Sequence, residues 1–402
     1  MEILLTKEEE AFRDDVRAFL DENLPQRIRV AARATPSVFA EPDIAMEWQR
    51  ILHEKGWLVY HWPTEYGGKD WTPTQQYLFE KECALADAPA LPVLGLKLLG
   101  PVICEFGTDA QKAELLPRIQ TGEDYWCQGF SEPGAGSDLA SLKTRAEKQG
   151  GKYIVNGSKI WTTHAHHADH IFALVRTDPE AKPQRGISFL LIDMRQPGVS
   201  VRPIIGMAGD HEVNQVFFED AEADARNLVG EEGQGWTIAK FLLENERGGS
   251  CFGPKLLADI ARIRRRAAET ADGDDGDLMQ DPDFARRLAR MELEAQALET
   301  TELRILADVA KGRPPGPNTS IIKLAASNLR QQVDAAALMA AGYYGLNLET
   351  QRPLYGNERP ALLDDEAAQI AAPQYLNSRA WTIFGGTNEV QRSIVAKTVL
   401  GL

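Results

Sequence analysis

The sequence lacks the features that mark secreted and membrane-spanning proteins. Its 402 residues include only four cysteines, which lie far apart without a Cys-x-x-Cys pair, so reduced thiols rather than disulfides are expected. The first residues, MEILLTKEEEAF, contain neither the basic nor the apolar segment of a secretory signal. The most apolar stretch, PALPVLGLKLLGPVI, is interrupted by lysine, glycine and proline, which argues against insertion into a membrane. A cytoplasmic protein is therefore expected.

Basic residues are scarce relative to acidic ones. Lys and Arg number 44 against 59 Asp and Glu, which gives a formal net charge of -15. This balance argues against nucleic acid as a partner, because contacts with a phosphate backbone need surplus positive charge. An anionic substrate would need a local basic site. With 43% apolar residues, a chain of this length is expected to bury a sizeable core in about two or three domains.

The residue pattern changes twice along the chain. Helical spacing of apolar residues dominates at both ends, whereas short runs rich in β-branched and aromatic residues fill the middle. The expected domains are an N-terminal α-helical domain over 1–122, a middle β domain over 123–231 and a C-terminal helical bundle over 232–402. Helices are expected over 44–55, 73–85 and 109–120, from 236 onward, and over 283–311, 320–341 and 389–398.

Local signals mark some of the element ends. Thr6 and Glu9 have the spacing of a capping box, in which each side chain bonds the other residue's backbone N–H. Pro25 should end the helix that begins there. In the middle domain, Asn156-Gly157 within GKYIVNGSKIW is expected to form the turn of a β-hairpin.

Two stretches of the middle domain contain residue types that suit ligand binding. FSEPGAGSD, residues 130–138, combines glycine and proline so that backbone N–H groups can approach a ligand, but no Gly-Lys-Ser/Thr follows, which excludes a P-loop. In IWTTHAHH, Trp161 and Thr163 alternate along a strand and should face the same side. An aromatic ring beside a hydroxyl suits a flat cofactor. Taken alone, the first stretch would more often be an ordinary surface turn, and the second would more often be part of an ordinary β-sheet core.

Two clusters invite a metal site. THAHHADH contains His164, His166, His167 and His170, but zinc ligands need converging geometry and no cysteine lies nearby, so these residues are interpreted as a loop. The run DGDDGD lacks the residue order of an EF-hand and is interpreted as a solvated loop between helices. No metal is expected.

Several stretches taken together resemble the acyl-CoA dehydrogenase family. They are GFSEPGAGSDLASLKTRA, NGSKIWTT, NERG and FGGTNEVQR, in the family's order and spacing over nearly the whole chain. The resemblance implies an acyl-CoA dehydrogenase-like fold with an N-terminal α-helical domain, a β-barrel-like middle domain and a C-terminal four-helix bundle. It also implies FAD as cofactor. Members of the family bind FAD without the Rossmann glycine fingerprint, which this sequence lacks.

The resemblance assigns flavin-binding residues in the middle domain. Phe130 and Ser131 match positions at the pyrimidine end of the flavin, and Gln128 is expected nearby. Trp161 would lie along the ring system. Thr163 would direct its hydroxyl toward N5, the atom that receives hydride.

Further positions are assigned around the rest of the ligands. Ser137 matches a position near the pantetheine arm of the CoA ester, and Thr387 and Glu389 match positions near the FAD phosphates and ribose. Phe384 and Arg247 are expected on the substrate side, with Arg247 at the active-site entrance or against CoA.

The family reaction needs a base that the usual motif does not supply here. A carboxylate takes the α-proton of the acyl-CoA while hydride leaves the β-carbon for flavin N5, and hydrogen-bond donors stabilise the developing enolate oxygen. In many members the base lies in a Tyr-Glu-Gly-Thr sequence. This chain has Phe384-Gly385-Gly386-Thr387 instead, and glycine carries no proton acceptor.

A minority of the family, resembling isovaleryl- and long-chain acyl-CoA dehydrogenases, place the base on a helix directly before an arginine. Here Glu246 precedes Arg247 in FLLENERGGS, so the resemblance implies Glu246 as the base. Gly385 would leave room for this carboxylate and offer its backbone N–H to the thioester oxygen. The competing interpretation is a solvated helix glutamate such as Glu244, which points to another face of the helix.

Two segments depart from the family pattern. Family homotetramers carry Arg-x-x-Phe-Gly and Gln-x-x-Gly-Gly segments that reach the FAD of a neighbouring subunit, but this chain has ADGDDGDLMQDPDFARRLARME and AALMAAGYYGLN. A dimer or tetramer is expected, with a heterotetramer containing a homologous subunit as the hypothesis, as in bacterial steroid side-chain enzymes. The implied partners are an acyl-CoA, with a weak preference for a bulky acyl group, and an electron-transferring flavoprotein. The alternatives are a non-catalytic or half-site subunit and a flavin oxidase on the same fold.

Overall fold

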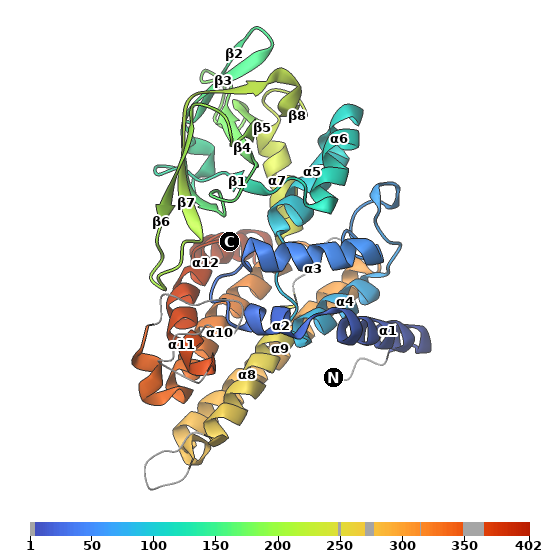
Figure 1. Ribbon diagram of the computed structural model, residues 1–402, viewed down its shortest axis with the longest axis vertical. Coiled ribbons are helices and arrows are strands. Elements are labelled where there is room, and N and C mark those ends of the chain that lie inside the picture. Colours follow the sequence, from blue (N-terminus) through green and yellow to red (C-terminus); the bar gives the residue numbers. More distant parts are fainter. Residues whose placement is uncertain (1–4, 248–250, 270–276, 314, 349–365) are drawn as a thin grey trace.

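The computed structural model describes residues 5–247, 251–269, 277–313, 315–348 and 366–402, without the side chains of residues 244–247 and 366. Most helices from the two ends of the chain form the lower part of the molecule in Figure 1, and the β domain lies above them with α5 and α6 beside it. In the described part of the chain, no helix combines the length and apolar character needed to cross a lipid bilayer.

The N-terminal region is helical, as predicted. Thr6 and Glu9 form the expected capping box, with the Thr6 N–H donating to Glu9 at 2.8 Å and the Glu9 N–H donating to Thr6 at 3.2 Å. The first helix ends at Asn23, just before Pro25. The helices are α1 Lys7–Asn23, α2 Gln26–Arg33, α3 Pro42–Lys55, α4 Pro73–Leu85, α5 Gly100–Phe106 and α6 Asp109–Thr121, and a π-helix, η2, spans Leu94–Leu99.

The middle region forms an eight-stranded sheet with the strand order β6-β7-β3-β2-β4-β5-β8, and β1 pairs in parallel with β4. The central strands β4 and β5 are buried along nearly their whole length, which agrees with their continuous apolar sequences. The strands are β1 Trp126–Gly129, β2 Arg145–Gln149, β3 Lys152–Thr163, β4 His170–Arg176, β5 Ile187–Asp193, β6 Val199–Ile204, β7 Val213–Asp224 and β8 Leu228–Val229.

The predicted hairpin turn at Asn156-Gly157 is wrong. Strand β3 continues through these residues, and the turn between β2 and β3 is Gly150-Gly151. Gly157 has a φ of 145° at a register shift against β7, and a Cβ there would lie 2.7 Å from the Cα of Thr144. This glycine is therefore required by a β-bulge and by close packing, two contexts that favour glycine as strongly as a turn does.

The C-terminal region is helical, and its predicted helices are confirmed to within a few residues. The helices are α7 Gly235–Arg247, α8 Phe252–Glu269, α9 Pro282–Val309, α10 Asn318–Ala340, α11 Glu366–Asn377 and α12 Asn388–Thr398. α8, α9 and α10 enclose an apolar core, and α11 and α12 pack on α10. α7 packs instead against β5 and η2, between the β domain and the lower helices (Figure 1).

Candidate active site

The loop over residues 130–138 is held against β3. The Ile160 N–H donates to the Ser131 carbonyl at 2.9 Å. The buried ammonium of Lys159 donates to the Phe130 carbonyl at 3.3 Å and to Glu132 at 2.7 Å. These bonds bring Ser131 next to the strand that carries Trp161. That the two residues share one binding surface stays a prediction.

Lys159 and Glu132 form an ion pair inside the sheet. Burial lowers the pKa of Lys159 to about 8, although the charge of Glu132 opposes this shift. Burial alone would raise the pKa of Glu132, but Lys159 and the N–H groups of Lys143 and Thr144 lower it. Glu132 is thus ionised near neutral pH and keeps Lys159 mostly protonated. Lys159 and Glu132 were not recognised from the sequence as residues of the site. The available signal was Lys159 itself, a lysine at an inward-facing position of NGSKIWTT.

Trp161 lies exposed on the sheet in a rare backbone conformation. Its φ is 60°, at a register shift between β3 and β7, and 60% of its surface is exposed. The bulge interrupts regular alternation, yet Trp161 and Thr163 keep solvent contact while Thr162 between them is buried. A left-handed conformation and an exposed indole are both unfavourable without a compensating role, which is typical of a ligand-binding surface.

The other predicted residues of this loop differ in their surroundings. The Phe130 ring is buried between Phe172 and Phe189, so Phe130 can contact a ligand only through its backbone. Gln128 in β1 is partly exposed, and Ser137 is exposed. A Cβ built at the neighbouring Gly134 or Gly136 would meet nothing within 4 Å, so packing within the described residues does not require either glycine.

The FGGT segment forms a tight turn before α12. Gly385 and Gly386 have φ values of 62° and 83°, and the Gln391 side chain donates to both carbonyls, at 3.0 and 3.4 Å. Among the described residues, the Gly385 N–H has no hydrogen-bond acceptor. Thr387 caps α12, accepting from the Val390 N–H at 3.2 Å, and Glu389 lies exposed in the first turn.

Aromatic contacts join this turn to the start of α8. The Phe384 and Trp381 rings are 5.6 Å apart, and Trp381 lies 6.1 Å from Phe252, the first residue of α8. Glu246 and Arg247 occupy the last turn of α7, six and five positions before Phe252, and their side chains lie outside the described part. The structure thus brings the start of α8 next to the FGGT turn, and α7 ends only a few residues earlier in the chain.

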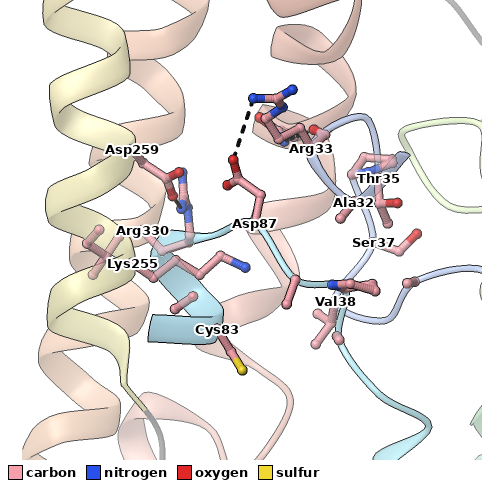
Figure 2. Close-up of a pocket in the computed structure, with 18 of the residues that line it drawn as sticks. Ala32, Arg33, Thr35, Ser37, Val38, Cys83, Asp87, Lys255, Asp259 and Arg330 are labelled. Carbon is pink, nitrogen blue, oxygen red and sulfur yellow. Dashed lines mark hydrogen bonds and ion pairs between the residues drawn. The ribbon is translucent and has the colours of Figure 1, made fainter. Parts of the chain in front are cut away.

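A cavity of 720 Å³ extends from this region between the N-terminal helices and the C-terminal bundle. Phe252 and Trp381 line one part of it, and residues of α2, α3, α4, η2, α8, α10 and α11 line the rest. Figure 2 shows one wall, where Asp87 pairs with Arg33 and Lys255 extends from α8 into the cavity. No local sequence pattern indicated that these distant segments enclose one cavity.

The histidine stretch forms a packed cluster. His166 stacks on His211 with ring centroids 3.7 Å apart, and burial lowers the pKa of His164 to about 3 and that of His166 to about 4. Among the described residues, no group of three or more His, Cys, Asp or Glu is arranged to hold a metal ion. The DGDDGD run falls largely on 270–276, outside the described residues.

Comparison with known families identifies the fold. Models of three successive domains match this chain, the acyl-CoA dehydrogenase N-terminal domain at 6–123, the middle domain at 127–221 and the C-terminal domain at 233–400. The chain belongs to the acyl-CoA dehydrogenase family. The predicted family and three-part fold are confirmed, whereas the boundaries at 122 and 231 stay predictions.

This acyl-CoA dehydrogenase is similar to bacterial members of its family. It is 36% identical to acyl-CoA dehydrogenase IpdE1 of Mycobacterium tuberculosis over 98% of this chain and 97% of that protein. Acyl-CoA dehydrogenase FadE26 of the same organism is 31% identical, over 100% and 99% of the two chains. Among solved structures, the Tcur3481-Tcur3483 steroid ACAD has a TM-score of 0.83 at 29% identity, covering 100% and 99%. The ChsE4-ChsE5 complex of M. tuberculosis has a TM-score of 0.81, also at 29% identity, covering 100% and 99%.

Proposed function

We propose that this acyl-CoA dehydrogenase uses FAD to convert an acyl-CoA thioester to its trans-2-enoyl-CoA. The fit of FAD is supported by the exposed Trp161 indole, by the loop bonded to β3 and by the open surface at Gly134 and Gly136. Bound FAD would supply the hydride acceptor. The residues proposed to hold it are Gln128, the Phe130 backbone, Ser131, Trp161, Thr163, Thr387 and Glu389.

Glu246 is the proposed general base, and the composition and hydrogen bonding of the FGGT turn support this assignment. The turn has no carboxylate, while its Gly385 N–H lacks an acceptor among the described residues and is therefore available to the thioester oxygen. A donor at that oxygen stabilises negative charge as the α-proton leaves. The base must then come from another segment, and Glu246 lies in the last turn of the helix that leads to Phe252. Ser137, Arg247 and Phe384 are the proposed CoA and substrate contacts.

The decisive experiment is anaerobic stopped-flow reduction of the flavin by acyl-CoAs. Glu246→Gln should slow bleaching by roughly a hundred- to ten-thousand-fold, the usual contribution of a general base, while FAD stays bound. Glu244→Gln, on another face of α7, is the matched control and should bleach normally. Bleaching that survives in Glu246→Gln contradicts the assignment.

The same experiment separates the alternative functions. A chain that binds FAD but is not bleached by any acyl-CoA would be a non-catalytic or half-site subunit. Rapid reoxidation of the reduced flavin by oxygen would indicate an oxidase, whereas slow reoxidation with electron transfer to an electron-transferring flavoprotein would support the dehydrogenase.

The proposed assembly is heteromeric. The segment AALMAAGYYGLN, which lacks the family's Gln-x-x-Gly-Gly, forms the end of α10 and a short helix, η6 (Gly342–Leu346). Tyr343 and Leu346 on η6 are 91% and 81% exposed, an unusual state for large apolar side chains. The similar ChsE4-ChsE5 structure contains two named chains. These observations favour a homologous partner subunit over this surface.

A further inference from the structure

The lining of the cavity beside the candidate active site combines apolar residues with charged ones, and one of its ion pairs is formed by Lys97 and Glu80. Lys97 and Glu80 both line it, and the Lys97 ammonium lies 2.8 Å from Glu80 Oε1. Phe79, Leu96 and Phe252 are among the apolar residues that line the same cavity. A plain hydrocarbon tail would gain nothing from a charged pair here, and desolvating that pair would be unfavourable.

Lys97 keeps hydrogen-bonding capacity that the described residues do not use. Its only hydrogen bond among them goes to Glu80, although an ammonium has three N–H donors. The Tyr60 hydroxyl donates to the same Glu80 oxygen, so Oε2 keeps no partner in the described part of the chain. The cavity wall therefore offers both N–H donors and a carboxylate acceptor.

The unused surface of Lys97 faces the cavity. Of its side chain, 34% is accessible, and Lys97 is among the residues that line the cavity. Burial would lower the pKa of Lys97, but Glu80 more than offsets this effect and raises it. Lys97 stays protonated, and Glu80 balances its charge.

The backbone around Lys97 is unusual as well. Lys97 lies in the π-helix η2, a conformation that occurs often at functional sites. The Trp62 indole donates to the Leu96 carbonyl at 2.8 Å, and His61 Nε2 lies 3.3 Å from the same oxygen. Side chains thus bond a carbonyl of the widened turn next to Lys97, which fixes where η2 presents its lysine.

From this geometry we infer that the acyl group carries a neutral oxygen, a hydroxyl or a keto group, which Lys97 and Glu80 bind inside the cavity. Lys97 donates to either oxygen, and Glu80 Oε2 can accept from a hydroxyl. A carboxylate is disfavoured, because it would lie beside Glu80 and repel it. The inference rests on the proposed function, since it assumes that the acyl chain extends from the FGGT turn past Phe252 and Trp381.

Equilibrium binding to the holoprotein tests this inference without requiring turnover. The probes are 3-(4-hydroxycyclohexyl)propanoyl-CoA, 3-(4-oxocyclohexyl)propanoyl-CoA, their 4-carboxy analogue and unsubstituted 3-cyclohexylpropanoyl-CoA, titrated by calorimetry. The hydroxy and keto esters should bind roughly 10- to 100-fold more tightly than the unsubstituted ester, the range for hydrogen bonds to charged groups. Equal affinities, or tightest binding of the carboxy ester, would overturn the inference.

Variants identify the residues responsible. Lys97→Met should remove the advantage of both oxygenated esters, whereas Glu80→Gln should weaken the hydroxy ester more than the keto ester. Lys81→Met is the matched control, because Lys81 pairs with Glu299 at 2.7 Å but does not line the cavity. An advantage that survives in Lys97→Met overturns the role of Lys97. If Lys97→Met does not fold, the relative affinities of the wild-type protein for the four esters still decide whether the cavity binds a neutral oxygen.

The binding preference and the proposed dehydrogenase function can be confirmed or rejected independently of each other. Selective binding of the oxygenated esters without flavin reduction would support the inference and reject the dehydrogenase function. Flavin reduction by all esters alike, with no difference in affinity, would support the function and reject the inference.

Discussion

At the scale of single residues, unfavourable conformations and charges mark the surface where the flavin is proposed to lie. Trp161 keeps a left-handed backbone that costs a non-glycine residue roughly 1–2 kcal/mol, and its indole is exposed. Lys159, two residues earlier, is fully buried. The hydrogen bonds of Lys159 to the Phe130 carbonyl and to the Glu132 carboxylate offset the desolvation of its charge. The same strand therefore both fixes the loop and presents the aromatic ring.

The Lys159–Glu132 pair should be essential for stability. Lys159→Met leaves Glu132 charged and buried, so the free energy of unfolding in urea should fall by roughly 3–5 kcal/mol. Lys152, in the same strand as Lys159, forms an exposed ion pair with Glu222 of β7, so Lys152→Met should change stability little. Equal effects of the two variants would contradict this role for Lys159.

The pair also predicts acid sensitivity. Because the pKa of folded Glu132 is lowered, its stabilising contribution is complete above the ordinary pKa of about 4.5 and is lost as the pH falls further. Glu132→Gln should therefore show a weaker loss of stability than the wild type between pH 5 and roughly pH 3.

At the scale of elements, one buried carboxyl fixes the start of α8 next to the FGGT turn. Glu302 on α9 accepts from the N–H groups of Phe252 and Gly253, at 2.9 and 3.2 Å. Burial raises the pKa of Glu302 to about 8, and these two bonds only partly oppose the shift. Phe252 packs on Trp381, so the position of α8 shapes the entrance of the cavity.

Glu302 should make stability fall as the pH rises. Between the ordinary pKa of 4.5 and about 8, the unfolded chain releases a proton that folded Glu302 keeps. A rise in pH over this range therefore stabilises the unfolded state relative to the folded state. Glu302→Gln retains an acceptor for both N–H groups and should remove this contribution. The measurement is the free energy of unfolding in urea at pH 5.5 and pH 8, and the change between the two pH values should be smaller in the variant than in the wild type. Glu294→Gln, at an exposed pair on α9, should leave the pH dependence unchanged.

At the scale of the whole molecule, the exposed surface of η6 predicts how the chain assembles. Purification of the tagged chain from its native cells should yield a complex with a second, homologous subunit and fewer than one FAD per chain. The variant Tyr343→Glu should lose that subunit, because a buried carboxylate in the interface would be desolvated without a partner. Leu293→Glu, at an exposed apolar residue of α9, is the control. A homo-oligomer with one FAD per chain contradicts the proposal.

The sequence by itself determined the order of the domains, most helix positions and the motifs that define the family. These features depend on periodicity and on caps within a few residues, as at Thr6 and Glu9, so they can be read locally. It also placed Trp161, Gly385 and Glu246 in their elements. The expected cytoplasmic location stays a prediction.

Only the tertiary structure decided which distant residues meet. The pairing of Lys159 with Glu132, the capping of α8 by Glu302 and the enclosure of Lys97 with Glu80 join segments between 17 and 50 residues apart. Asn156-Gly157 fits both a hairpin turn and a bulge, and pairing with β7 selected the bulge. Such choices depend on packing between elements, which no local pattern encodes.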